Sequence, residues 1–155
     1  MRAVVQRVVD ASVVVAGEPV GRIDRGLLVY LGVERGDARA DREYIVGKVA
    51  GMRIFPDKAG RMNLALEELA VRPGERLGIL AISQFTLHGD MRKGRRPSYN
   101  AAEDPEKAQR EYEQAVADWR AAGFLVETGV FGAHMSVGYT NDGPVTIVLD
   151  SRRIL

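Results

Sequence analysis

Polar groups that could bind a carbonyl stand directly after an apolar run of the chain. The run at residues 77–82 predicts a buried strand, and the sequence SQFTL follows at 83–87. Polar residues at the end of a buried strand are where α/β domains tend to place ligand sites. Hydroxyl, amide and backbone N–H groups there could donate to an oxyanion and position a water molecule. The candidates for this chemistry are Ser83, Gln84, Phe85 and Thr86.

A second polar segment, NDGPVT at 141–146, could offer backbone carbonyls to a ligand. A cis bond between Gly143 and Pro144 costs little compared with other cis bonds, and it would point two successive carbonyls the same way. The same residue types are also typical of a plain hairpin turn between strands at 133–139 and 145–149. Both interpretations stay open on this segment alone.

Neither segment contains a side chain that titrates near neutral pH, so no general base is evident. The chain has no Cys, which excludes thiol nucleophiles and Cys-ligated zinc. Its two histidines, His88 and His134, make neither a zinc triad nor a Ser-His-acid constellation. No glycine-rich nucleotide-binding motif opens a helix. We therefore expect no metal and no cofactor, and a hydrolase of this kind would need a substrate that is already activated.

Four basic residues lie within five positions of the loop that follows the first segment. They are Arg92, Lys93, Arg95 and Arg96. Such a loop could contact phosphates, because Lys and Arg supply sequence-independent affinity for nucleic acid. A solvated basic loop explains the pattern equally well. The net charge of the chain is only +1, so any contact with nucleic acid must come from a local patch.

The length of 155 residues and a hydrophobic content of 46% predict a single domain over residues 1–155 with a real core. No apolar run approaches the length needed to span a membrane. The start of the chain lacks the uninterrupted apolar stretch of a signal peptide. We therefore expect a cytoplasmic protein that makes no membrane contact.

Strand patterns dominate the first third of the chain. The pattern predicts β-branched strands at 4–9 and 12–15, a short strand at 20–24, a turn at 24–26 and a buried strand at 27–33. Arg7 interrupts the first run, and we interpret it as a solvent-facing residue of an alternating strand.

Helical periodicity appears twice, over 37–52 and 104–122. The second helix has Asp104 as its N-cap and Pro105 at its first position, and its apolar stripe places Trp119 in the core. The pattern as a whole predicts an α/β fold. We expect two packed β-sheets, barrel-like, with two main helices on one outer face, in three β/β/α layers.

The two polar segments together resemble the signature motifs of the D-aminoacyl-tRNA deacylases. The resemblance covers the whole chain, including the loop at 93–98 and the segment from Phe131 to Met135. It implies a homodimer with its active sites at the subunit interface. It also implies that the Gly-Pro bond is cis and that the pair reaches into the site of the other subunit.

The resemblance further implies a role for each site residue. The carbonyls of Gly143 and Pro144 would hold the α-amino group of the substrate and block an L side chain, which is rejection by clash. The backbone N–H of Phe85 would donate to the oxyanion, with Ser83, Gln84 and Thr86 shaping the pocket. The 2′-hydroxyl of the terminal adenosine of tRNA would assist. The remaining substrate-binding residues would be Asn141, Met135 and Thr146.

The expected function is hydrolysis of the ester bond of D-aminoacyl-tRNA, with glycyl-tRNA mischarged on tRNA-Ala as a further substrate. The partners implied are aminoacyl-tRNA and a second copy of the chain. Two alternatives remain: a tRNA-binding module without catalysis, suggested by the basic loop, and a structural dimer in which the Gly-Pro pair is only a turn. A related family that acts on mischarged L-alanyl-tRNA carries a trans Gly-Pro bond, and Phe85 favours the D-specific branch.

Overall fold

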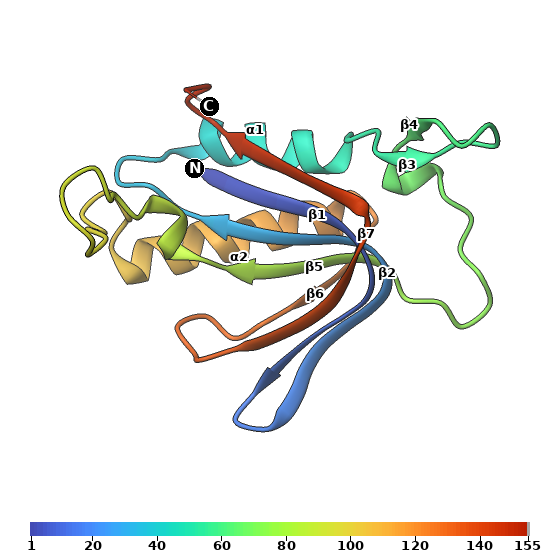
Figure 1. Cartoon of the computed structure of the whole chain (residues 1–155), viewed down its shortest axis with the longest axis horizontal. Coiled ribbons are helices and arrows are strands. Elements are labelled where there is room, and N and C mark those ends of the chain that lie inside the picture. The colour runs from blue at the N-terminus through green and yellow to red at the C-terminus, as the bar shows by residue number, and fades with distance from the viewer. Residues whose placement is uncertain (155) are drawn as a thin grey trace.

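The main sheet of the computed structural model, which describes residues 1–154, has five strands in the order β6-β5-β2-β1-β7 (Figure 1). These strands are β1 (Arg2–Val15), β2 (Glu18–Gly32), β5 (Leu77–Ser83), β6 (Leu125–Thr128) and β7 (Ser136–Asp150). β5 runs parallel to β2 and to β6, whereas β1 is antiparallel to β2 and to β7. A separate two-stranded sheet consists of β3 (Phe55–Pro56) and β4 (Met62–Leu64).

Two helices, α1 (Arg39–Ala50) and α2 (Pro105–Ala121), cover one face of the main sheet. Their buried side chains pack in one hydrophobic cluster with Leu27 and Val29 of β2 and with Ile79 of β5. Successive side chains of a strand point to opposite faces, so the alternate residues of β2 and β5 serve the other side of the sheet.

Trp119 of α2 lies at the centre of the helical layer. Its side chain is fully buried, and its indole N–H donates to the carbonyl of Val46 on α1 at 3.2 Å. This contact ties the two helices together, and it confirms the predicted place of Trp119 in the core.

The opposite face of the sheet is covered by the far half of the β1–β2 hairpin, which bends back over it (Figure 1). Val13 and Ile23 from that half pack in one cluster with Leu80 and Ile82 of β5. A methyl group added at Gly21 would lie 2.6 Å from a backbone carbonyl oxygen of β6, so this approach is close. The predicted α/β class, with two helices and a β/β/α order of layers, is confirmed, and the second β-layer belongs to the same bent sheet.

The predicted turn at 24–26 is wrong, because β2 continues through it as one strand. Gly26 has a φ of +143° and lies so close to β5 that an added Cβ would stand 1.9 Å from the carbonyl oxygen of Gly78. Glycine therefore serves a bend and a close approach of two backbones here, and the chain does not reverse.

The helices begin and end close to their predicted limits, within two residues of 37–52 and one of 104–122. Within residues 1–154, no helix is both long enough and apolar enough to cross a membrane.

Candidate functional site

A cavity of about 580 Å³ lies beside the carboxyl end of β5. Its walls come from the SQFTL segment, from the start of α2 and from residues 131–137. Four residues that the sequence assigned to the site line this cavity, namely Ser83, Gln84, Phe85 and Met135. Thr86 does not line the cavity, but its hydroxyl accepts a hydrogen bond from the side-chain amide of Gln84. The end of the buried strand is thus open to a ligand.

Backbone hydrogen bonds hold the SQFTL segment against β2. The N–H of Gln84 donates to the carbonyl of Leu31 at 2.9 Å, and the N–H of Leu87 donates to the carbonyl of Gln84 at 3.3 Å. Residues Phe85–His88 form the 3-10 turn η2, which begins with the N–H of Phe85. The first N–H groups of such a turn have no partner inside it, so this donor is available to a ligand.

Gly32 allows β2 to lie directly against this segment. A Cβ added there would stand 2.7 Å from the carbonyl oxygen of Gln84 and 3.0 Å from Nε2 of His88. This glycine was not predicted as part of the site, and the only sign of it in the sequence is its place near the end of an apolar run.

The rim of the cavity carries two exposed aromatic rings. Phe85 is 57% exposed, and Tyr99 meets its ring edge-on with 5.0 Å between the ring centres. Tyr99 follows the basic loop directly, so the loop and the cavity are neighbours.

The titratable side chains that line the cavity include Glu103, Tyr112 and His134, and the first two are held by partners within the chain. A hydrogen bond from Lys107 lowers the pKa of the Glu103 carboxyl to about 2. Burial raises the pKa of the Tyr112 hydroxyl, which donates to the carbonyl of Ala81 at 2.8 Å. Residues 1–154 contain no cluster of three His, Cys, Asp or Glu side chains that could hold a metal ion.

The NDGPVT segment is not a hairpin turn, because β7 pairs with β1 in the same direction before and after it. Gln6 pairs with Thr146 and Val8 pairs with Asn141, so residues 142–145 bulge out of the strand. The hairpin interpretation is therefore wrong. The peptide bond between Gly143 and Pro144 is cis, and both residues are exposed.

Arg7 anchors this bulge. Its guanidinium bonds the carbonyl of Asp142 at 3.2 Å, the carboxylate of the same residue at 2.9 Å and the carbonyl of Ile54 at 2.6 Å. Arg7 is only 9% exposed, so the prediction that it faces solvent is wrong. Its charge is tolerated inside the fold because two distant segments supply oxygen acceptors.

Two polar side chains complete the anchoring of the bulge. The side-chain amide of Asn141 donates to the carbonyls of Arg7 and Val145, at 3.3 and 3.0 Å. The amide of Gln6 donates to the hydroxyl of Thr146 at 3.0 Å. Asn141 and Thr146 therefore shape the bulge, and neither lines the cavity.

The two polar segments do not meet within one chain. Ser83 pairs with Leu31, and Leu31 pairs with Ala3, which lies four to five residues before the part of β1 beside the bulge. The two segments are therefore separated by this offset along the strands and by the three strand spacings from β5 to β7. Together these amount to a distance on the order of 20 Å. Consistent with that, Gly143 and Pro144 do not line the cavity.

The basic loop is closed at its base by a bridge between Asp90 and Ser98. Arg92 is paired with the carboxylate of Asp90, at 2.6 and 2.9 Å, and this pairing lowers the pKa of that carboxyl to about 2. The other three basic residues, Lys93, Arg95 and Arg96, are exposed. The loop thus offers three charges to a partner and uses the fourth internally.

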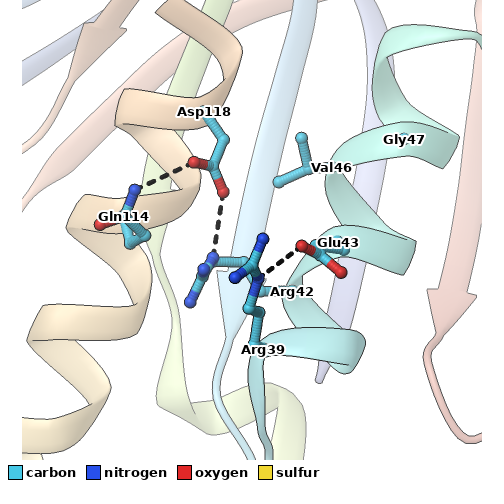
Figure 2. Close-up of a pocket in the computed structure, with 7 residues that line it drawn as sticks. All are labelled: Arg39, Arg42, Glu43, Val46, Gly47, Gln114 and Asp118. Carbon is cyan, nitrogen blue, oxygen red and sulfur yellow. Dashed lines mark hydrogen bonds and ion pairs between the residues drawn. The ribbon is translucent and has the colours of Figure 1, made fainter. Parts of the chain in front are cut away.

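A second cavity, of about 550 Å³, lies between α1 and α2 and contains none of the predicted site residues (Figure 2). Arg42 reaches from α1 to Asp118 on α2 at 3.0 Å, and Arg39 pairs with Glu43 at 2.6 Å (Figure 2). The charged side chains around this cavity are paired with one another, and the pair between Arg42 and Asp118 links the two helices. We therefore assign this cavity no ligand.

The chain is similar to a known protein family over almost its whole length. A family model described as D-Tyr-tRNA(Tyr) deacylase matches residues 4–150. A D-aminoacyl-tRNA deacylase of Desulfitobacterium hafniense (strain DSM 10664 / DCB-2) is 54% identical over 153 residues, which are 99% of each chain. The protein of the same name from Koribacter versatilis (strain Ellin345) is 53% identical over 153 residues, again 99% of each chain.

Two solved structures are similar in fold. One, described as c-Myc DNA Unwinding Element Binding Protein, has a TM-score of 0.86 and 36% identity and covers 97% of this chain and 98% of its own. The other, a probable eukaryotic D-amino acid tRNA deacylase, has a TM-score of 0.72 and 20% identity over 96% of this chain and 98% of its own. At that identity the second likeness shows the fold alone.

Proposed function

Because this chain belongs to the D-Tyr-tRNA(Tyr) deacylase family, we propose that it hydrolyses the ester bond of D-aminoacyl-tRNA and releases free tRNA and the D-amino acid. The observation that carries the proposal is the cavity at the end of β5, where Ser83, Gln84 and Phe85 stand together at a rigid turn. The match over residues 4–150 supports treating the chain as one deacylase domain.

The proposed reaction uses little chemistry from side chains. Water adds to the ester carbonyl carbon, and the developing oxyanion is stabilised by the N–H of Phe85. The bond to the ribose oxygen then breaks, and that oxygen takes up the proton that the water gives up, relayed by the neighbouring 2′-hydroxyl of the substrate. This route needs no protein base. Thr86 is a poor nucleophile here because its hydroxyl is bonded to the side-chain amide of Gln84, which cannot act as a base.

A second copy of the chain would complete the site. The bulge that carries Gly143 and Pro144 is exposed and lies on the order of 20 Å from the cavity of its own chain. The bulge of a partner subunit could enter that cavity instead. β7 also has no partner strand on its outer edge in the part of the chain described, which leaves this region open to association. We therefore propose a homodimer with active sites at the interface.

The partner's bulge would supply the chiral selection. In this proposal the carbonyls of Gly143 and Pro144 accept hydrogen bonds from the substrate α-amino group, and an L side chain would clash with them. Glycine has no side chain, so glycyl-tRNA mischarged on tRNA-Ala would also be cleaved. Met135 would line the amino-acid side of the cavity. Lys93, Arg95 and Arg96 would contact the tRNA backbone.

A deacylation time course on D-tyrosyl-, L-tyrosyl- and glycyl-tRNA tests the activity. Rapid loss of the D and glycyl esters with the L ester intact would support both the reaction and the chiral selection. Loss of all three esters would leave the activity and remove the selection. Salt-sensitive binding of tRNA without loss of any ester would favour the alternative suggested by the basic loop, a binding module.

A pair of variants tests the proposed oxyanion donor. Phe85→Pro removes the N–H at the first position of η2, where proline is tolerated, and Phe85→Leu keeps it. We expect kcat to fall by about 100-fold or more in the first variant and to change little in the second. Equal activity in the two variants would exclude the Phe85 N–H as donor.

Mixing two impaired variants tests the shared site. Phe85→Pro damages the cavity, and Gly143→Ala damages the bulge. A mixed dimer contains one site in which both parts are intact, so co-refolding should recover about a quarter of the wild-type activity. No recovery would show that both parts act within one chain.

A further inference from the structure

One buried titratable group beside the cavity has no part in the proposed reaction. His88 ends the turn η2, and its side chain is fully buried. Neither ring nitrogen makes a hydrogen bond of ordinary geometry within residues 1–154, although the backbone of Gly32 lies close to the ring. Buried polar groups are normally paired, so two unpaired nitrogens in the turn that begins at Phe85 need an explanation.

A carboxylate oxygen that faces this ring is also unpaired. Oε2 of Glu34 lies 3.9 Å from Nδ1 of His88 and has no partner among the described residues. The other carboxylate oxygen of Glu34 accepts a bond from Arg152 at 3.0 Å, which holds the carboxylate in place. At 3.9 Å the two groups are not hydrogen-bonded, and an imidazole with its proton on Nε2 presents only a lone pair to this oxygen.

Burial and nearby cations oppose protonation of this ring. Arg2 on β1 donates to the carbonyl of Leu87, next to His88, at 3.1 Å. The amino group of Met1 lies nearby and is paired with Asp37 at 2.7 Å. Burial lowers the pKa of His88 most, and these two cations lower it further, while Glu34 and the backbone of Gly32 act in the opposite direction. The imidazole is therefore neutral at pH 7.

The ring and the turn have little freedom to move separately. β2 packs against the ring at Gly32, where an added Cβ would stand 3.0 Å from Nε2. The turn itself is short, and the N–H of Gly89 closes it onto the carbonyl of Thr86 at 3.0 Å. A displacement of the ring is therefore passed to the backbone of η2, which begins at Phe85.

We propose that His88 is a positioning residue for the N–H of Phe85 and that protonation of its ring toward Glu34 shifts η2 out of its active geometry. This inference rests on the proposed role of Phe85 as oxyanion donor. Protonation makes Nδ1 a donor, and a charge-assisted bond to Glu34 would close the 3.9 Å gap to about 2.8 Å. In this proposal η2 moves together with the ring of His88, and the N–H of Phe85 then no longer points at the developing oxyanion.

The primary test follows the Phe85 amide by NMR from pH 4 to pH 8 and needs no substrate. We expect its shift to titrate with the midpoint of the His88 ring, below the usual value of about 6.5. His88→Gln should abolish this titration, whereas His134→Gln, which removes the only other histidine, should leave it. Glu34→Gln removes the anion that favours the charged ring and should move the midpoint to lower pH.

A Phe85 shift that does not change with pH, or one that still titrates in His88→Gln, would overturn the inference. Should that variant fail to fold, the direction of the shift in Glu34→Gln decides the matter, and an unmoved midpoint counts against it.

The kinetic test compares kcat for D-tyrosyl-tRNA in wild type and His88→Gln across the same pH range. We expect kcat of the wild type to fall by about tenfold more than that of the variant as pH drops through the midpoint. Parallel profiles would mean that His88 has no role in positioning. If no ester is cleaved at any pH, the proposed function fails, and the amide titration still decides whether His88 moves η2.

Discussion

The two polar segments of this protein are held in place by different means. The SQFTL segment is bonded through its backbone to β2, and Gly32 lets the two backbones meet closely. The NDGPVT bulge is instead held mainly by side chains, above all by Arg7. The position of the first segment therefore depends on the sheet itself, whereas the position of the second depends on one buried cation.

We expect the largest effect on stability from a substitution at Gly32. Gly32→Ala should lower the free energy of unfolding by about 3 kcal/mol, because its Cβ would collide with the backbone of Gln84. Urea unfolding measures this loss. The matched control is Gly47→Ala on α1, where nothing lies within 4 Å and a gain of about 0.5 kcal/mol is expected. Equal stabilities of the two variants would contradict the close approach.

Arg7 gives the next largest effect. Arg7→Met should destabilise the fold by about 2 kcal/mol, because buried acceptors lose their donors. Deacylation of D-tyrosyl-tRNA should fall at least about tenfold as the bulge loosens. Arg22→Met removes an exposed cation paired with Asp10 and Asp24, and it should cost less than about 0.5 kcal/mol. Full activity in a destabilised Arg7→Met protein would show that the bulge has another anchor.

Gly143 should separate activity from stability. It has a φ of +126°, and an added Cβ would lie 2.8 Å from Cγ2 of Val145, so Gly143→Ala strains the bulge by about 1 to 2 kcal/mol. We expect activity toward D-tyrosyl-tRNA to fall at least about tenfold. Gly138→Ala, elsewhere on β7, meets only Ser12 at 3.9 Å and should leave both unfolding and deacylation near wild type. Similar kinetics for the two variants would remove the bulge from the active site.

The smallest effect concerns Glu103 at the edge of the cavity. Its folded pKa of about 2 lies below the usual value of about 4.3, so its stabilisation is present above pH 4.3 and is lost as pH falls toward 2. Because solvent screens the pair with Lys107, Glu103→Gln should remove only about 1 kcal/mol of acid-dependent stability, as measured by urea unfolding at pH 5 and pH 3. The same change at exposed Glu67 serves as control. An unchanged pH dependence in Glu103→Gln would contradict this assignment.

Much of the fold follows from local patterns. The helix near 104–122 was predictable because capping residues and an apolar stripe agree, and the buried strand before SQFTL was predictable from its continuous apolar run. The prediction of a turn at 24–26 was wrong because Gly26 is needed for a close approach to β5, which lies about 50 residues later in the chain. Local propensity carries no information about such an approach.

The candidate site divides in the same way. Residue type and spacing identified the two segments. The burial of Arg7 could not be read from its strand, since its acceptors come from Ile54 and Asp142, 47 and 135 residues away. The continuity of β7 through the NDGPVT segment was equally hidden, because turn residues and a strand bulge share one composition.

The amino-acid sequence is enough to identify the chemical groups that are present, the positions of the core helices and the family that the chain resembles. These properties depend on residue types and on periods of a few residues. The tertiary structure alone decided that Arg7 anchors the bulge, that Gly32 brings β2 against the SQFTL segment and that the two segments lie apart in one chain. The physical reason is that each of these depends on contacts between residues far apart in sequence, which form only when the bent sheet closes.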